Sequence, residues 1–165
     1  MANRVVLALA AVAGLCAAGC GGSADSTAPA VGSQFQHEAL AVCRAALTQK
    51  HAEGPFPYSD FNPSQPDPSE LPGVAPFFTK AIATYATWLR RMQALRQPPG
   101  GRRAWTDLLK AIEVQLHLHQ DQRAAALRGD TATFSSDYQK GFKAIDDLQR
   151  AADAAGVSAC GSVDR

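Results

Sequence analysis

One segment in the second half of the chain carries side chains that could bind a metal ion. Glu113, His117 and Asp121 follow one another at intervals of four residues, and residues four apart share one side of an α-helix. Carboxylates and an imidazole on one face form a donor set that divalent metals accept. The same spacing is typical of a solvated helix face. A metal site would therefore need ligands from a second helix, for which His37 and His51 are the remaining histidines.

His119 lies on a different side of the same segment. It falls between Leu116 and Arg123, within the apolar stripe that contains Ile112 and Leu127. A histidine that faces the core of a helical bundle can ligate a metal or haem, but a hydrogen bond to a neighbouring Tyr or Arg is an ordinary core contact. The C-x-x-C-H pattern of covalent haem does not occur. We expect no cofactor, with a metal, haem or apolar-ligand carrier centred on His119 as the alternative.

The sequence contains none of the common enzyme motifs. G-x-S-x-G, the Walker loop, H-E-x-x-H, G-x-G-x-x-G and the EF-hand loop do not occur, and each of these places reacting groups or ligands at a fixed spacing. No spacing singles out a pair of carboxylates for acid–base work. We therefore expect a protein that is not an enzyme.

The N-terminus has the form of a secretory signal. Arg4 precedes the eleven-residue apolar run Val5–Leu15, which is too short to span a bilayer. The following Ala17-Ala18-Gly19-Cys20 resembles the bacterial lipobox, in which the cysteine thiol receives diacylglycerol before cleavage. Ala17 departs from that pattern, which prefers Leu at this position. The alternative is a secreted protein cleaved after Ala18 or Gly19.

The lipobox resemblance implies a division of the chain into three parts. Residues 1–19 would be a signal peptide, residues 20–32 would hold the lipidated Cys20 and a flexible tether rich in Gly and Ser, and residues 33–165 would form the folded domain. The mature protein would then be exported and anchored by its lipid to the extracytoplasmic face of the cell membrane.

Two cysteines remain once the leader is accounted for. Cys16 leaves with the signal peptide and Cys20 is acylated, which leaves Cys43 and Cys160 in a compartment where thiols oxidise. Neither has a His or a second Cys at metal-ligand spacing. The sequence predicts one structural disulfide between the start and the end of the domain.

Apolar residues recur at helical spacing in four segments of this domain. We expect helices from about Ser33 to Ala52, from near Pro76 to the Pro98–Gly101 turn, from there to a left-handed cap at Gly129, and from an N-cap at Asp130 to Gly156. No strand-like alternation occurs. The predicted fold is all-α, an antiparallel up-down four-helix bundle with a long Pro-rich loop between its first two helices.

Two connections offer surfaces for partners. The Pro-rich loop at 53–72 has six prolines and three aromatic residues, which would either contact a partner or cap the core (Phe56, Tyr58 and Phe61). The turn between the second and third helices is crowded with arginines, which would either face an anionic membrane or simply complement a helix dipole (Arg90, Arg91, Arg96, Arg102 and Arg103). In an up-down bundle the arginine turn lies at the membrane-proximal end and the loop at the distal end.

Beyond its leader, the domain resembles small helical lipoproteins and secreted proteins of actinobacteria. The resemblance rests on Trp105 after a Pro-Pro-Gly-Gly turn, Gly129-Asp130 before the last helix, and Cys160 near the end. That group has no assigned activity to carry over. With 16 Lys and Arg against 15 Asp and Glu, nucleic acid is not an expected partner.

These observations together favour a binding or scaffolding protein at the cell envelope. Its partner would be another envelope protein or a cell-wall component, besides the membrane that its lipid enters. The carrier alternative predicts that His119 and residues of other helices surround a cavity, whereas a tightly filled core would favour a scaffold.

Overall fold

The amphipathic segments form long helices, as their apolar spacing predicts. The computed structural model describes residues 32–96, 98 and 100–163, and over these residues it is all-helical, without strands. Its elements in chain order are α1 (Ser33–Ala52), α2 (Leu71–Gln93), α3 (Arg102–Arg128), α4 (Thr131–Ala154) and the short 3-10 helix η1 (Ser158–Ser162). The predicted lipidation site Cys20 and the proposed signal peptide lie outside the described residues.

The sharp turn between α3 and α4 follows from two adjacent residues. Gly129 has φ 65°, a left-handed conformation that glycine adopts without steric cost, and it ends α3. The Asp130 carboxylate then accepts a hydrogen bond from the Thr133 amide at 3.0 Å and caps α4. Hydrogen bonds from Thr133 lower the pKa of the Asp130 carboxyl below its usual value.

The start of α2 differs from the prediction. The helix begins at Leu71 rather than near Pro76, so Pro72 occupies the first turn and Pro76 lies inside the helix. Both prolines suit a first turn, but Pro76 inside the helix lacks the amide proton of one intrahelical hydrogen bond. Leu71 and Val74 are fully buried, and the burial of two such side chains offsets the missing bond.

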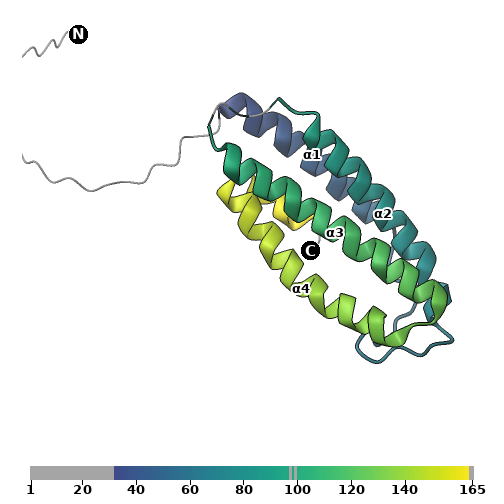
Figure 1. Cartoon of the computed structure of the whole chain (residues 1–165). Helices are drawn as coiled ribbons and strands as arrows, with labels where there is room; N and C mark the ends of the chain where they lie inside the picture. The colour runs from purple at the N-terminus through teal and green to yellow at the C-terminus, as the bar shows by residue number, and fades with distance from the viewer. Residues whose placement is uncertain (1–31, 97, 99, 164–165) are drawn as a thin grey trace, which may run out of the picture.

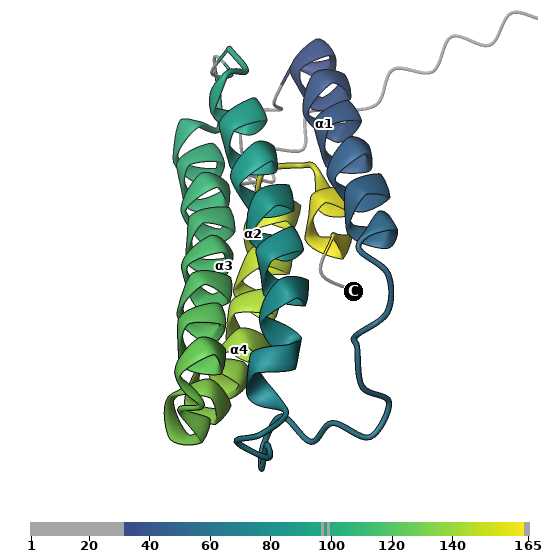
Figure 2. The same cartoon turned by 90° about the vertical axis from the view of Figure 1, so that its right-hand side faces the viewer.

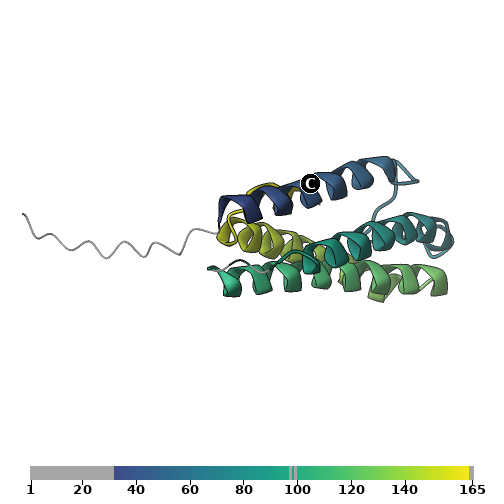
Figure 3. The ribbon, with the colours of Figure 1, turned by 90° about the horizontal axis from the view of Figure 1, so that it is seen from above.

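The helices run alternately up and down, in the predicted bundle (Figure 1). Helix α3 packs against α2 on one side and α4 on the other, while α1 packs against α2 and η1. In Figure 3, α1 lies along the upper side of the bundle with the other helices beneath it. The predicted disulfide between Cys43 of α1 and Cys160 of η1 is present and joins residues 117 apart in the sequence.

Helix α1 covers only part of the length of α2. The Lys80 ammonium donates a hydrogen bond at 3.0 Å to the carbonyl of Glu53, the residue after α1. Lys80 is the tenth residue of α2, so α2 extends about 13 Å past the end of α1. In Figure 2, α1 and η1 lie beside the upper part of the bundle, and the Pro-rich loop descends alongside the rest. We call the start of α1 with the turn after α2 the basic end, and the loop with the Gly129–Asp130 turn the loop end.

The hydrophobic core accordingly has two parts. Near the basic end, α1 and η1 contribute to a cluster with the other helices, centred on Tyr85, Trp88, Trp105 and Leu108. Near the loop end, a second cluster contains no α1 residue, and Phe56 and Phe61 of the loop pack against it. No helix in the described part of the chain is both long and apolar enough to cross a membrane.

Candidate functional site

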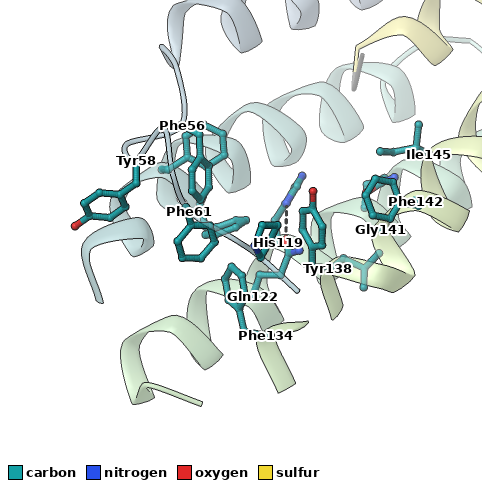
Figure 4. Close-up of a pocket in the computed structure, with 15 residues that line it drawn as sticks. Phe56, Tyr58, Phe61, His119, Gln122, Phe134, Tyr138, Gly141, Phe142 and Ile145 are labelled. Carbon is teal, nitrogen blue, oxygen red and sulfur yellow. Dashed lines mark hydrogen bonds between the residues drawn. The ribbon is translucent and has the colours of Figure 1, made fainter. Parts of the chain in front are cut away.

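A pocket of about 450 Å³ lies between the Pro-rich loop and helices α2, α3 and α4 (Figure 4). Its walls come from four segments, and none of its lining residues belongs to α1. Helix α1 thus forms no part of the pocket walls. Its lining comprises Phe56, Tyr58, Phe61 and Pro63 of the loop, Phe77 and Phe78 of α2, Gln115, Leu118, His119 and Gln122 of α3, and Phe134, Tyr138, Gly141, Phe142 and Ile145 of α4.

Aromatic rings hold the loop in place over the core. The ring centroids of Phe56 and Phe77 are 5.0 Å apart, those of Phe61 and Phe134 are 5.7 Å apart, and both pairs meet edge to face. This is a favoured geometry for aromatic pairs, because the positive edge of one ring meets the negative face of the other. Phe56 and Phe61 thus cap the core, which is the second of the two roles considered for the loop aromatics. Tyr58 of the same loop is 40% exposed.

The α3 wall of the pocket is polar. Gln115, His119 and Gln122 follow at helical spacing and lie on one face of α3. The Nδ1 atom of His119 is 3.1 Å from Oε1 of Gln122, within hydrogen-bond distance. The His119 ring also contacts the rings of Phe78 and Tyr85, with centroids 6.0 Å and 5.0 Å away. His119 therefore lies on the inner face of α3 with Ile112, whereas Leu127, which was expected on the same stripe, is 53% exposed.

Gln115 is buried in this wall, with only 2% of its surface exposed. Its Nε2 atom makes no hydrogen bond with any residue that the structure describes. Buried amide groups are nearly always paired. Sequence reasoning did not single out Gln115, although it follows Ile112 by three residues and shares its buried face.

Exposed aromatic side chains mark the mouth of the pocket. Phe142 is 53% exposed and Tyr58 is 40% exposed, and both line the pocket. In Figure 4, the loop aromatics lie on one side of His119 and Tyr138, and Phe142 and Ile145 lie on the other. Tyr138 supports Phe142 through an edge-to-face contact at 5.0 Å. Apolar surface at such a rim is typical of ligand-binding grooves.

The proposed metal-binding trio lies elsewhere on α3. Nε2 of His117 is 4.0 Å from Oε1 of Glu113, and both side chains are more than half exposed. Asp121 is exposed too, and none of the three lines the pocket. His37 and His51 are exposed residues of α1. Among the described residues, no group of three or more His, Cys, Asp or Glu side chains is placed to hold a metal ion.

The arginine cluster lies at the opposite end of the bundle from the pocket. All five arginines are exposed, around the end of α2 and the start of α3 (Arg90, Arg91, Arg96, Arg102 and Arg103). Helix α1 begins at this same end (Figure 2). The two candidate partner surfaces, the Pro-rich loop and the arginine cluster, thus lie at opposite ends of the bundle.

In comparisons with known proteins, the chain matches no protein-family model, no curated protein and no solved structure. The residues themselves therefore carry the functional argument.

Proposed function

We propose that this protein is a non-catalytic, lipid-anchored carrier of the cell envelope that holds an apolar small molecule in the pocket around His119. The observation that carries the proposal is the aromatic pocket of about 450 Å³. Small-molecule sites are concave, mostly apolar and roughly 300–1,000 Å³ in volume, with a few polar groups that orient the ligand. The cavity supports a carrier rather than a scaffold with a filled core.

The lining favours an organic ligand over a metal. Eight of the fifteen lining residues are Phe or Tyr, and the polar ones are amides and a single histidine. A ligand of roughly 20 non-hydrogen atoms, at about −0.3 kcal/mol per atom, would bind with a dissociation constant of tens of micromolar. That affinity is sufficient for a carrier that must also release its cargo.

The proposed anchor suits this role. A lipid on Cys20 would connect through the tether to the start of α1, at the basic end. The residues that line the pocket lie toward the loop end, whereas α1 begins at the basic end, so the anchor of this proposal would join the bundle at the other end. The mouth of the pocket would then be accessible to other molecules of the envelope.

Gly141 provides a direct test, because it lines the pocket from α4 and a Cβ atom added to it meets no atom within 4 Å. A Gly141→Trp variant places an indole ring in the pocket, and Gly141→Ala is the matched control. The uncharged dye N-phenylnaphthylamine should bind the wild type and Gly141→Ala with increased fluorescence, whereas Gly141→Trp should bind it at least tenfold more weakly. Equal dye binding by all three proteins would contradict the proposal.

A further inference from the structure

The pocket contains one buried polar atom whose partner is not another residue of the described chain. Gln115 is 2% exposed and lines the pocket, and its Nε2 atom makes no hydrogen bond there. An amide that is buried without a partner is destabilising, because it has lost its hydrogen bonds to water. A ligand with an acceptor atom would satisfy it.

The neighbouring polar residues of the wall already contact each other. Gln122 is 5% exposed, and its Oε1 lies 3.1 Å from Nδ1 of His119. The hydrogen bond between them fixes both side chains one to two turns further along α3. Oε1 of Gln122 is thus engaged within the wall, whereas the buried Nε2 atom of Gln115 has no hydrogen-bond partner among the described residues.

The charge of the lining determines which acceptor fits. No Lys, Arg, Asp or Glu is among the residues that line the pocket. Moving an ionised carboxylate or ammonium group from water into such a site is strongly unfavourable unless an opposite charge meets it. A neutral carbonyl or hydroxyl oxygen loses far less hydration and can accept a hydrogen bond from Gln115.

We propose that Gln115 recognises the ligand, and that the ligand is an uncharged, apolar molecule with a single carbonyl or hydroxyl acceptor directed at the Gln115 amide. This inference rests on the proposed carrier function and specifies the chemical class of the cargo. The aromatic walls contact the apolar body of the molecule, and Gln115 fixes its orientation.

Three naphthalene derivatives of similar size test this inference. Acetylnaphthalene has a neutral carbonyl acceptor, ethylnaphthalene has none, and naphthoate is anionic. Titration calorimetry with the full chain carrying Cys20→Ala avoids competition from detergent or acyl chains. We expect acetylnaphthalene to bind about tenfold more tightly than ethylnaphthalene, as one net hydrogen bond allows, and naphthoate to bind most weakly.

Variants of two glutamines on α3 connect this preference to one side chain. Gln115→Met keeps the length of the side chain without its amide, and should reduce the preference for acetylnaphthalene to less than twofold. Gln120→Met is the control, because Gln120 is exposed and does not line the pocket. It should keep the full preference. The comparison of the three ligands uses protein in which Gln115 is unchanged, so its result does not depend on how well any pocket variant folds.

Different failures have different meanings. Equal binding of acetylnaphthalene and ethylnaphthalene, or tightest binding of naphthoate, would overturn the inference about the cargo and leave the carrier function in place. If none of the three ligands binds and the dye does not bind either, the carrier function itself is wrong.

Discussion

The stability of Gly141 variants tests whether the pocket is open, independently of any ligand. Gly141 lies inside α4, where glycine is less favourable than alanine by about 1 kcal/mol because it loses more backbone freedom on folding. An added Cβ meets no atom within 4 Å. We expect Gly141→Ala to raise the free energy of unfolding by about 1 kcal/mol, and the melting temperature by roughly 3 °C.

The change in the free energy of unfolding caused by Gly141→Trp has opposite signs for an open pocket and for a filled core. In a filled core, an added indole forces neighbouring side chains out of their preferred rotamers and costs about 1–3 kcal/mol. In the open pocket, burial of about 100 Å² of the ring would contribute about 2.5 kcal/mol. We therefore expect Gly141→Trp to be at least as stable as the wild type.

Thermal and urea unfolding, monitored by circular dichroism, measure both effects. Dye at one hundred times its wild-type dissociation constant should stabilise the wild type and Gly141→Ala by about 2.7 kcal/mol, and Gly141→Trp, which binds it at least tenfold more weakly, by no more than about 1.4 kcal/mol. A Gly141→Trp protein that is less stable than the wild type by 1 kcal/mol or more would refute the open pocket and the function inferred from it.

Further predictions concern the disulfide, a helix cap, the anchor and the basic end. Joint replacement of Cys43 and Cys160 by Ala should lower the free energy of unfolding by about 4–5 kcal/mol on the loop-entropy model, and an unchanged urea midpoint would contradict a structural disulfide. Asp130→Ala should destabilise the protein at neutral pH. The pKa of this carboxyl is lower in the folded protein than its ordinary value of 3.8, so the ionised carboxylate stabilises the folded state at pH values above 3.8. Melting curves of the two proteins should converge as the pH falls through the pKa of folded Asp130, and a difference that persists at lower pH would contradict this cause. Cys20→Ala should move the protein from the membrane to the soluble or secreted fraction, and retention in the membrane would exclude the lipid anchor. Replacement of all five arginines of the basic end by Gln should weaken the binding of unlipidated protein to anionic liposomes at low salt; unchanged binding would favour their role at the helix dipole.

Local signals in the sequence were sufficient for most of the fold. Gly129 and Asp130 determine the turn between α3 and α4 through their own backbone and side-chain preferences, so this turn was predictable. The start of α2 was not, because Pro72 and Pro76 both satisfy the rule for a first turn. Burial of Leu71 and Val74 decides between them, and burial depends on the tertiary structure.

The pocket could not be predicted from residue spacing. Its walls come from the Pro-rich loop and three helices that are far apart in the sequence, and their juxtaposition depends on how the loop docks. His119 was singled out because histidine is rare and chemically distinctive. Gln115 and Gln122 resemble residues of a solvated helix surface by type, but they share the inner face with Ile112 and His119. Helical register was the signal that could have identified them.

The basic end and the loop end of the bundle are held together by interactions of different strength. At the basic end, the disulfide joins α1 covalently to η1 and closes off much of the core. Over the pocket, the loop is held by ring contacts and by exposed hydrogen bonds at Ser64, whose carbonyl accepts from Ser135 at 3.3 Å and whose hydroxyl accepts from Gln139 at 3.0 Å. Each such bond contributes about 1 kcal/mol. The loop is thus attached to the helices by weaker contacts than those that join α1 to η1, as the proposed carrier function would require of the segment over the pocket.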